Sequence, residues 1–167
     1  MEKSYLCSML KFDSNGLLTP YRPIPCQVKD LKTHFVDSFD SETRPKNFDK
    51  YIRYSNEIKA LLRGIEVKQW VNGSFVTKKI NPKDIDVISF VSHTLVKELG
   101  DKLYPFRPEG SWDVFGIDAY VLEVHAVGSR YHFYTQSDTA YWREQFGHTK
   151  PNKKGIKKEK GFLEIIC

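Results

Sequence analysis

The chain has 167 residues, of which 40% are hydrophobic and 28% charged, and its formal net charge is +5. This length favours one domain with a sizeable core, and no apolar run is long enough to span a bilayer. Residues 1–7 lack the apolar centre of a signal peptide, and three cysteines at irregular spacing do not suit a disulfide framework. We therefore expect a reduced, cytoplasmic protein.

The positive charge is concentrated toward the C-terminus and favours polyanionic partners such as nucleotides or RNA. An ordinary solvated surface explains the same modest excess equally well.

In the first part of the chain we expect a strand within residues 4–12 and then a proline-rich extended segment. Apolar residues at helical spacing predict a helix over residues 28–39. A second helix is predicted from Pro45, which suits a first helical turn, to a C-terminal cap at Gly64.

Core strands are predicted at residues 65–71 and 84–91, and Ser92 is expected to cap a short helix that ends at Gly100. The remaining expectations are a loop at 101–111, a strand within 112–124, an extension of the sheet at 131–134, a helix from Ser137 or Asp138 to Gly147, and a strand at 161–167.

These elements predict a single α/β domain over residues 1–167, with a mixed, twisted sheet and helices mainly on one face. Its expected parts are an N-terminal portion (1–64), a sheet that carries the active site (65–135), and a C-terminal helix, basic loop and strand (136–167).

Two carboxylates mark the start of the second core strand. Asp84 and Asp86 are one residue apart, so on a strand both side chains leave the same face. Like charges this close repel unless a cation lies between them, and divalent ions prefer oxygen ligands. Upstream, an apolar run ends in a Gly73-Ser74 turn, whose backbone N–H groups suit a phosphate. Metal and phosphate together indicate phosphoryl or nucleotidyl transfer.

Nucleotidyl transfer uses two metal ions about 4 Å apart, which two carboxylates rarely hold alone. Asp118 is the best third ligand, because it lies in the middle of a predicted strand, where a lone aspartate is disfavoured. Glu123 competes, but strand alternation puts it on the face opposite Asp118. A polar turn entering a strand explains the Asp84–Asp86 pair without any function.

These residues resemble the signature of the DNA polymerase β-like nucleotidyltransferase superfamily. Here it stands as Gly73-Ser74, nine residues and then Asp84-Ile85-Asp86-Val87, with Asn72 in place of an apolar residue before the glycine. Over nearly its whole length the chain is similar to small, solitary bacterial nucleotidyltransferase-like proteins of little characterised function. Some related proteins are toxins, antitoxins or parts of phage-defence modules, which is an analogy only, because fold does not fix function.

The resemblance implies a polymerase β-type fold and two Mg²⁺ or Mn²⁺ ions at the acids. Asp84 and Asp86 would hold both metals. Asp118 would complete the metal on the acceptor side and help to deprotonate the attacking hydroxyl.

The resemblance also implies a site for a nucleoside triphosphate such as ATP. Gly73 would allow the phosphates to approach closely, and Ser74 would contact the triphosphate. Lys78 or Lys79 would neutralise the β- and γ-phosphates, although a solvent-facing loop explains either lysine equally well.

Other features carry weaker signals. The lysine-rich segment 148–160 suits an RNA acceptor or a triphosphate, and a solvated loop is the simpler interpretation. The five histidines are scattered, and His125 and His132 are not at a zinc spacing. Gly73-Ser74 does not belong to a Walker A motif.

We therefore expect a Mg²⁺-dependent nucleotidyltransferase whose acceptor is RNA, such as the tRNA 3′ end, or a protein hydroxyl. The chain is too small to carry its own acceptor-recognition domain, so a homodimer or a cognate partner protein is expected, without a membrane. Two alternatives stay open: a catalytically silent module that binds a nucleotide or partner, and a metal-dependent nuclease that uses the same acids.

Overall fold

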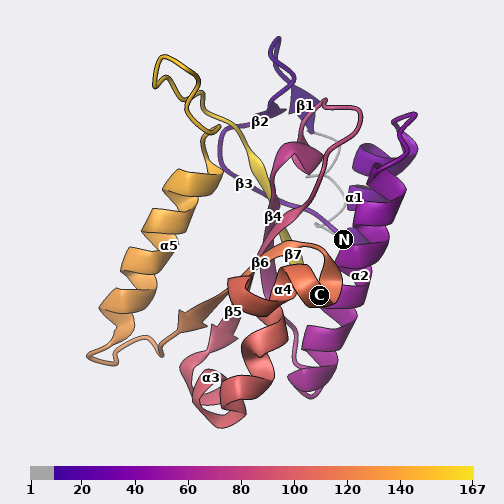
Figure 1. The fold of residues 1–167 in the computed structure, drawn as a ribbon. Coiled ribbons are helices and arrows are strands. Elements are labelled where there is room, and N and C mark those ends of the chain that lie inside the picture. The colour runs from indigo at the N-terminus through magenta and orange to yellow at the C-terminus, as the bar shows by residue number, and fades with distance from the viewer. Residues whose placement is uncertain (1–9) are drawn as a thin grey trace, which may run out of the picture.

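The computed structural model describes residues 10–167 and is built on a mixed five-stranded sheet (Figure 1). The strands, in sheet order, are β3 (Pro23–Pro25), β7 (Phe162–Ile166), β4 (Lys68–Asn72), β5 (Asp86–Ser92) and β6 (Asp118–Val124), with a separate pair β1 (Lys11–Phe12) and β2 (Leu18–Thr19). Strand β3 is parallel to β7, β4 is antiparallel to both β7 and β5, and β5 is parallel to β6. The separate pair, β1 and β2, is antiparallel.

Most helices cover one face of this sheet. The helices α1 (Val28–Lys32), α2 (Arg44–Leu61) and α4 (Pro108–Phe115) bury apolar side chains against the strand residues that point toward them. Between α1 and α2 the chain continues as a π-helix, η2 (Thr33–Asp37). The predicted helix over 28–39 is therefore present in two forms, and the second helix starts one residue before the predicted Pro45.

A single long helix, α5 (His132–Phe146), lies on the other face. Figure 1 shows it standing apart, on the side opposite α2. A smaller apolar cluster joins it to the sheet, formed by Trp70, Ile88, Leu122, Phe146 and Phe162. The mixed α/β architecture predicted from the sequence is thus confirmed.

Two predicted elements are wrong. Residues 101–111 are not a loop: they form a 3-10 helix, η4 (Gly100–Phe106), and the first half of α4. Proline misled the prediction, because Pro108 occupies the first turn of α4, where its missing N–H costs nothing. Residues 131–134 do not extend the sheet but begin α5, which starts before the predicted Ser137 or Asp138 cap. Their aromatic side chains are largely exposed, so no sheet face buries them.

Element boundaries also moved. Strand β4 begins at Lys68 rather than at residue 65, and β5 begins at Asp86 rather than at Asp84. Of the strand expected within 4–12, the structure has Lys11–Phe12, and residues 4–9 lie outside the described part. The hydroxyl of Ser92 caps α3 (His93–Leu99) by accepting from the N–H of Leu95, as predicted. In residues 10–167, no helix combines the length and apolarity that a membrane crossing requires.

Candidate functional site

Two of the three predicted acids meet at the start of two parallel strands. Asp86 and Asp118 are register partners in β5 and β6, so their side chains leave the same face of the sheet. The next residue of each strand, Val87 and Ala119, points the other way, into the core under α1, α2 and α4. Asp86 and Asp118 therefore lie on the face covered by α5. Asp84 precedes β5, so the strand alternation expected for Asp84 and Asp86 does not apply. The structure still places its charge near Asp86.

The three carboxylates are electrostatically coupled. Burial, together with the negative charges of Asp118 and Asp84, raises the pKa of Asp86 to about 7. Lys160 and Lys150 act in the opposite direction. A buried carboxylate facing two others is the environment that a divalent cation relieves.

A glycine bend lies against Asp86. Strand β4 ends at Asn72, and Gly73 then adopts a φ of 84°, in the region that favours glycine. A Cβ atom built on Gly73 would lie 2.1 Å from Oδ2 of Asp86, which no real structure tolerates. The chain continues as a short 3-10 helix, η3 (Ser74–Val76). The structure thus brings Gly73 and Asp86 into direct contact, with Ser74 next in the chain.

Asn72 adds an uncommitted oxygen to the same place. It is the register partner of Asp86 in β4, and its side-chain N–H donates to the carbonyl of Phe146 at 3.3 Å. Its Oδ1 is buried and has no hydrogen-bond partner among the described residues. Buried polar atoms are normally satisfied, so an orphaned oxygen beside carboxylates fits a site that takes a cation or water. Asn72, the residue that departs from the resembled signature, thus presents an unpaired oxygen atom beside Asp86.

The acids are spread more widely than the ligands of one bound ion. In the part of the chain from residue 10 onward, only His93, Glu123 and His125 bring three ligand atoms within 4.8 Å of one another. The negative charges of the three carboxylates repel one another, which explains their spacing without a cation. The donor set of carboxylate and amide oxygens still fits a hard ion such as Mg²⁺, which prefers oxygen ligands.

The two predicted phosphate lysines, Lys78 and Lys79, are exposed residues of the loop that follows η3. Lys78 packs toward the β1–β2 pair: its N–H donates to the carbonyl of Gly16, and its ammonium lies 5.8 Å from the ring centre of Phe12. The positive charges that act on the Asp86 carboxylate are instead those of Lys160 and Lys150.

The cation at the site is Lys160, which sequence reasoning did not single out. It is only 6% exposed, and its ammonium donates to the carbonyl of Gly73 at 3.3 Å. Burial lowers the pKa of Lys160 to about 8, against the charge of Asp86, which raises it. One signal was available: of the six lysines between residues 148 and 160, Lys160 is the nearest to the buried strand β7, separated from it only by Gly161.

Arg44 holds the loop between the bend and the acids. Its fully buried guanidinium donates to five backbone carbonyls, those of Phe35, Phe75, Thr77, Lys79 and Ile80. Three of these, Thr77, Lys79 and Ile80, belong to the segment that follows η3, and Phe75 lies within η3. Burial lowers the pKa of Arg44 to about 10, far above neutrality. Arg44 thus fixes the course of the chain from the bend toward Asp84, a role that no sequence spacing revealed.

Aromatic side chains extend the site under α5. Burial, the charge of Asp118 and a hydrogen bond to that carboxylate raise the pKa of Tyr120 to about 12, so its hydroxyl stays protonated and donates. The rings of Tyr120 and Trp142 pack 4.4 Å apart.

A cavity of about 750 Å³ lies between α5 and the β3–β7 side of the sheet. Arg22, His132, Arg143 and His148 line it, together with Gly147, whose carbonyl accepts from the N–H of Lys160. The cavity is therefore joined to the acid site through the segment that carries Lys160.

A family model matches residues 10–166, and it describes a family of unknown function (DUF6932). Comparisons with curated proteins and with solved structures gave no significant match.

Proposed function

The chain belongs to DUF6932, a family of unknown function, and from its own residues we propose that it is a Mg²⁺-dependent nucleotidyltransferase. It would transfer a nucleoside monophosphate from a nucleoside triphosphate to a hydroxyl acceptor. The observation that supports this most is the contact between the Gly73 bend and Asp86, beside Asp118.

The residues divide into metal ligands and phosphate contacts. Asp86, Asp118 and Asp84 would hold Mg²⁺, with Oδ1 of Asn72 as a further oxygen. When bound, the ion would neutralise charge on the phosphate oxygens as a Lewis acid. The missing Cβ of Gly73 leaves the backbone open to a close phosphate.

The remaining steps belong to the chain. The acceptor hydroxyl attacks the α-phosphorus, a new phosphate ester bond forms, and the bond between the α-phosphorus and the oxygen that bridges to the β-phosphate breaks, so pyrophosphate leaves. Asp118 accepts the hydroxyl proton, and the Tyr120 hydroxyl orients its carboxylate. Lys160 supplies positive charge beside the bend for the triphosphate.

The acceptor would bind on the α5 side. The basic residues around the 750 Å³ cavity and Lys150 beside Asp86 favour a polyanionic acceptor, so RNA is preferred over a protein hydroxyl. A homodimer or a partner protein would complete acceptor recognition, and a toxin–antitoxin or phage-defence setting remains an expectation of the resemblance alone.

The alternative is a catalytically silent module, and one observation favours it. The buried Lys160 already offers Asp86 a positive charge, so the site is partly neutralised without any metal. A site of this kind binds a nucleotide or a partner without turnover.

The test is incubation with α-labelled nucleoside triphosphates, Mg²⁺ or Mn²⁺, and total RNA or cell protein. We expect label transfer to RNA that Asp86→Asn abolishes, while Asp49→Asn, a matched change at an exposed acid of α2, leaves it intact. Mg²⁺ binding with no transfer to any acceptor would support the silent module. RNA cleavage without added nucleotide would support the nuclease.

A further inference from the structure

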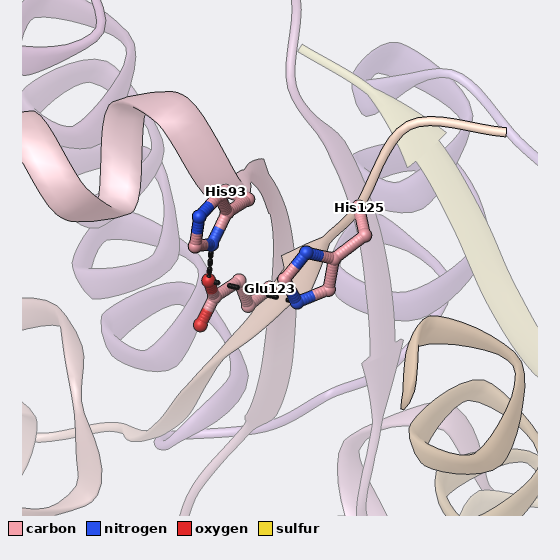
Figure 2. A group of neighbouring side chains, drawn as sticks. All are labelled: His93, Glu123 and His125. Carbon is pink, nitrogen blue, oxygen red and sulfur yellow. Dashed lines mark hydrogen bonds and ion pairs between the residues drawn. The ribbon is translucent and has the colours of Figure 1, made fainter. Parts of the chain in front are cut away.

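A second candidate site lies at the opposite end of β5 and β6 (Figure 2). His93 is the first residue of α3, directly after β5, while Glu123 lies near the end of β6 and His125 just beyond it. The two parallel strands pair Val91 with Glu123, so the ends of both strands are adjacent. His93 is 30 residues from Glu123 in the chain, and the strand pairing brings it beside Glu123 and His125.

Their ligand atoms converge on one point. Figure 2 shows Nδ1 of His93 and Nε2 of His125 both directed at Oε1 of Glu123. His93 forms a hydrogen bond with that oxygen, and Nε2 of His125 lies 3.8 Å from it. All three atoms lie within 4.8 Å of one another, and the two imidazole rings stack with centres 4.5 Å apart.

The 3.8 Å separation is too long for a hydrogen bond. It is close to the spacing of two ligands on one tetrahedral zinc ion, roughly 3.3 Å for bond lengths of about 2.0–2.1 Å. Two imidazole nitrogens and one carboxylate oxygen are also a common protein ligand set for zinc, with a fourth position left to water. Glu123 is 38% and His93 45% exposed, so an ion reaches them from solvent.

Helix α5 fixes the strand that carries two of the ligands. The hydroxyl of the buried Thr135 accepts from the N–H of His125 at 2.8 Å and donates to the carbonyl of Glu123 at 3.3 Å. The Nδ1 atom of His132 lies 3.0 Å from the carbonyl of His125. His125 itself is only 13% exposed. Such outer contacts preorganise ligands and raise metal affinity.

We propose that His93, Glu123 and His125 bind one divalent transition-metal ion, with Zn²⁺ as the matching chemistry, and that the ion ties the start of α3 to the end of β6. The nitrogen ligands separate this site from the oxygen-only acid site, which suits Mg²⁺. Because the ion binds the folded chain, it stabilises the fold by mass action.

The experiment uses the full chain without a polyhistidine tag, stripped with a chelator and titrated with Zn²⁺ by calorimetry. Co²⁺ is titrated in parallel, and its visible absorption reports the ligand geometry. We expect one Zn²⁺ per chain, a thermal shift of several degrees, and a tetrahedral or five-coordinate Co²⁺ spectrum.

The variants His125→Ala and Glu123→Gln should weaken Zn²⁺ binding at least about 100-fold, and Thr135→Val about 10-fold. The control His148→Ala removes a histidine of the separate His148–Glu144 pair and should leave binding unchanged. His93→Ala, at a half-exposed position, guards against a failure to fold, which circular dichroism checks. Equal Zn²⁺ affinity in the wild type and all three ligand variants, or binding abolished only by His148→Ala, would overturn the proposal.

Discussion

At the residue scale, the candidate active site depends on close approach. The Asp86 carboxylate lies in the space that the Cβ atom of any other residue at position 73 would occupy. The motif therefore needs glycine at this position for two reasons, its positive φ and its lack of a Cβ atom.

We predict that Gly73→Ala lowers nucleotidyl transfer at least about 100-fold and the free energy of unfolding by about 1–3 kcal/mol, because strain and the clash add. Label transfer and urea unfolding measure the two effects. Gly155→Ala is the matched control: it has a φ of 76° but open space around the new Cβ atom. It should lose some stability and keep activity, and equal loss of activity in both variants would contradict the role of Gly73.

Asp86→Asn should stabilise the metal-free chain, increasingly as the pH rises. The pKa of Asp86 is raised from 3.8 to about 7 in the folded state, so the unfolded chain releases the proton first. Ionisation of Asp86 therefore lowers the free energy of unfolding progressively between about pH 4 and pH 7, and this loss persists above pH 7. Urea unfolding should show a gain on the order of 2 kcal/mol at pH 8, smaller at pH 5. A gain that is independent of pH, or one also seen in Asp49→Asn, would refute this electrostatic account.

The residues of the site were unequally visible in the sequence. Gly73, Asp84 and Asp86 form a local motif with fixed spacing, and Asp118 stands out as a lone aspartate within a predicted strand, so reading the chain was enough to select them. Lys160 is brought to Gly73 by pairing of β7 with β4, a contact between residues far apart in the chain. The nearby loop lysines were therefore chosen instead.

At the scale of elements, the loop after the bend is held from outside. Residues 77–80 form no helix or strand, and the guanidinium of Arg44, at the start of α2, donates to the carbonyls of Thr77, Lys79 and Ile80. Buried carbonyls left without donors are costly, and here the Arg44 side chain supplies the donors that backbone N–H groups supply in a helix or strand.

We predict that Arg44→Met lowers the free energy of unfolding by more than about 3 kcal/mol, because five carbonyls lose a donor at once. Chemical denaturation measures it. Arg53→Met, which removes an exposed ion pair with Glu57 in the same helix, should cost less than about 1 kcal/mol. Similar costs for the two variants would show that the loop does not depend on Arg44.

Helices were predicted less well than core strands, for a local reason. Strand β5 is largely apolar and buried, so its pattern is strong. In contrast, α4 begins at Pro108 and η4 contains Pro105, and proline indicates both a helix start and a loop. The exposed aromatic residues at the start of α5 resemble a strand in composition, and only their lack of burial reveals a helix.

At the scale of the whole molecule, β6 contributes one residue to each of the two candidate metal sites. Asp118 begins the strand and Glu123 lies five residues later, on the opposite face, so about 16 Å separates them along the strand. Sites this far apart without shared partners act independently.

We therefore predict that Mg²⁺ and Zn²⁺ raise the melting temperature additively. Differential scanning fluorimetry with each ion and with both measures this, with Asp86→Asn removing only the Mg²⁺ shift and His125→Ala only the Zn²⁺ shift. A combined shift well below the sum would mean that the ions compete for one site.

The position of β7 between β3 and β4 has a consequence for the route by which the chain folds. Within residues 10–167, strand β3 joins the sheet only through β7, which follows it by more than a hundred residues. Pairings with such high contact order form slowly, because a long intervening chain has to be closed first. Until β7 pairs, the strand edges of β3 and β4 that it covers are unpaired. The ammonium of Lys160 is then not yet beside Gly73, so a partially folded chain would lack one part of the candidate site.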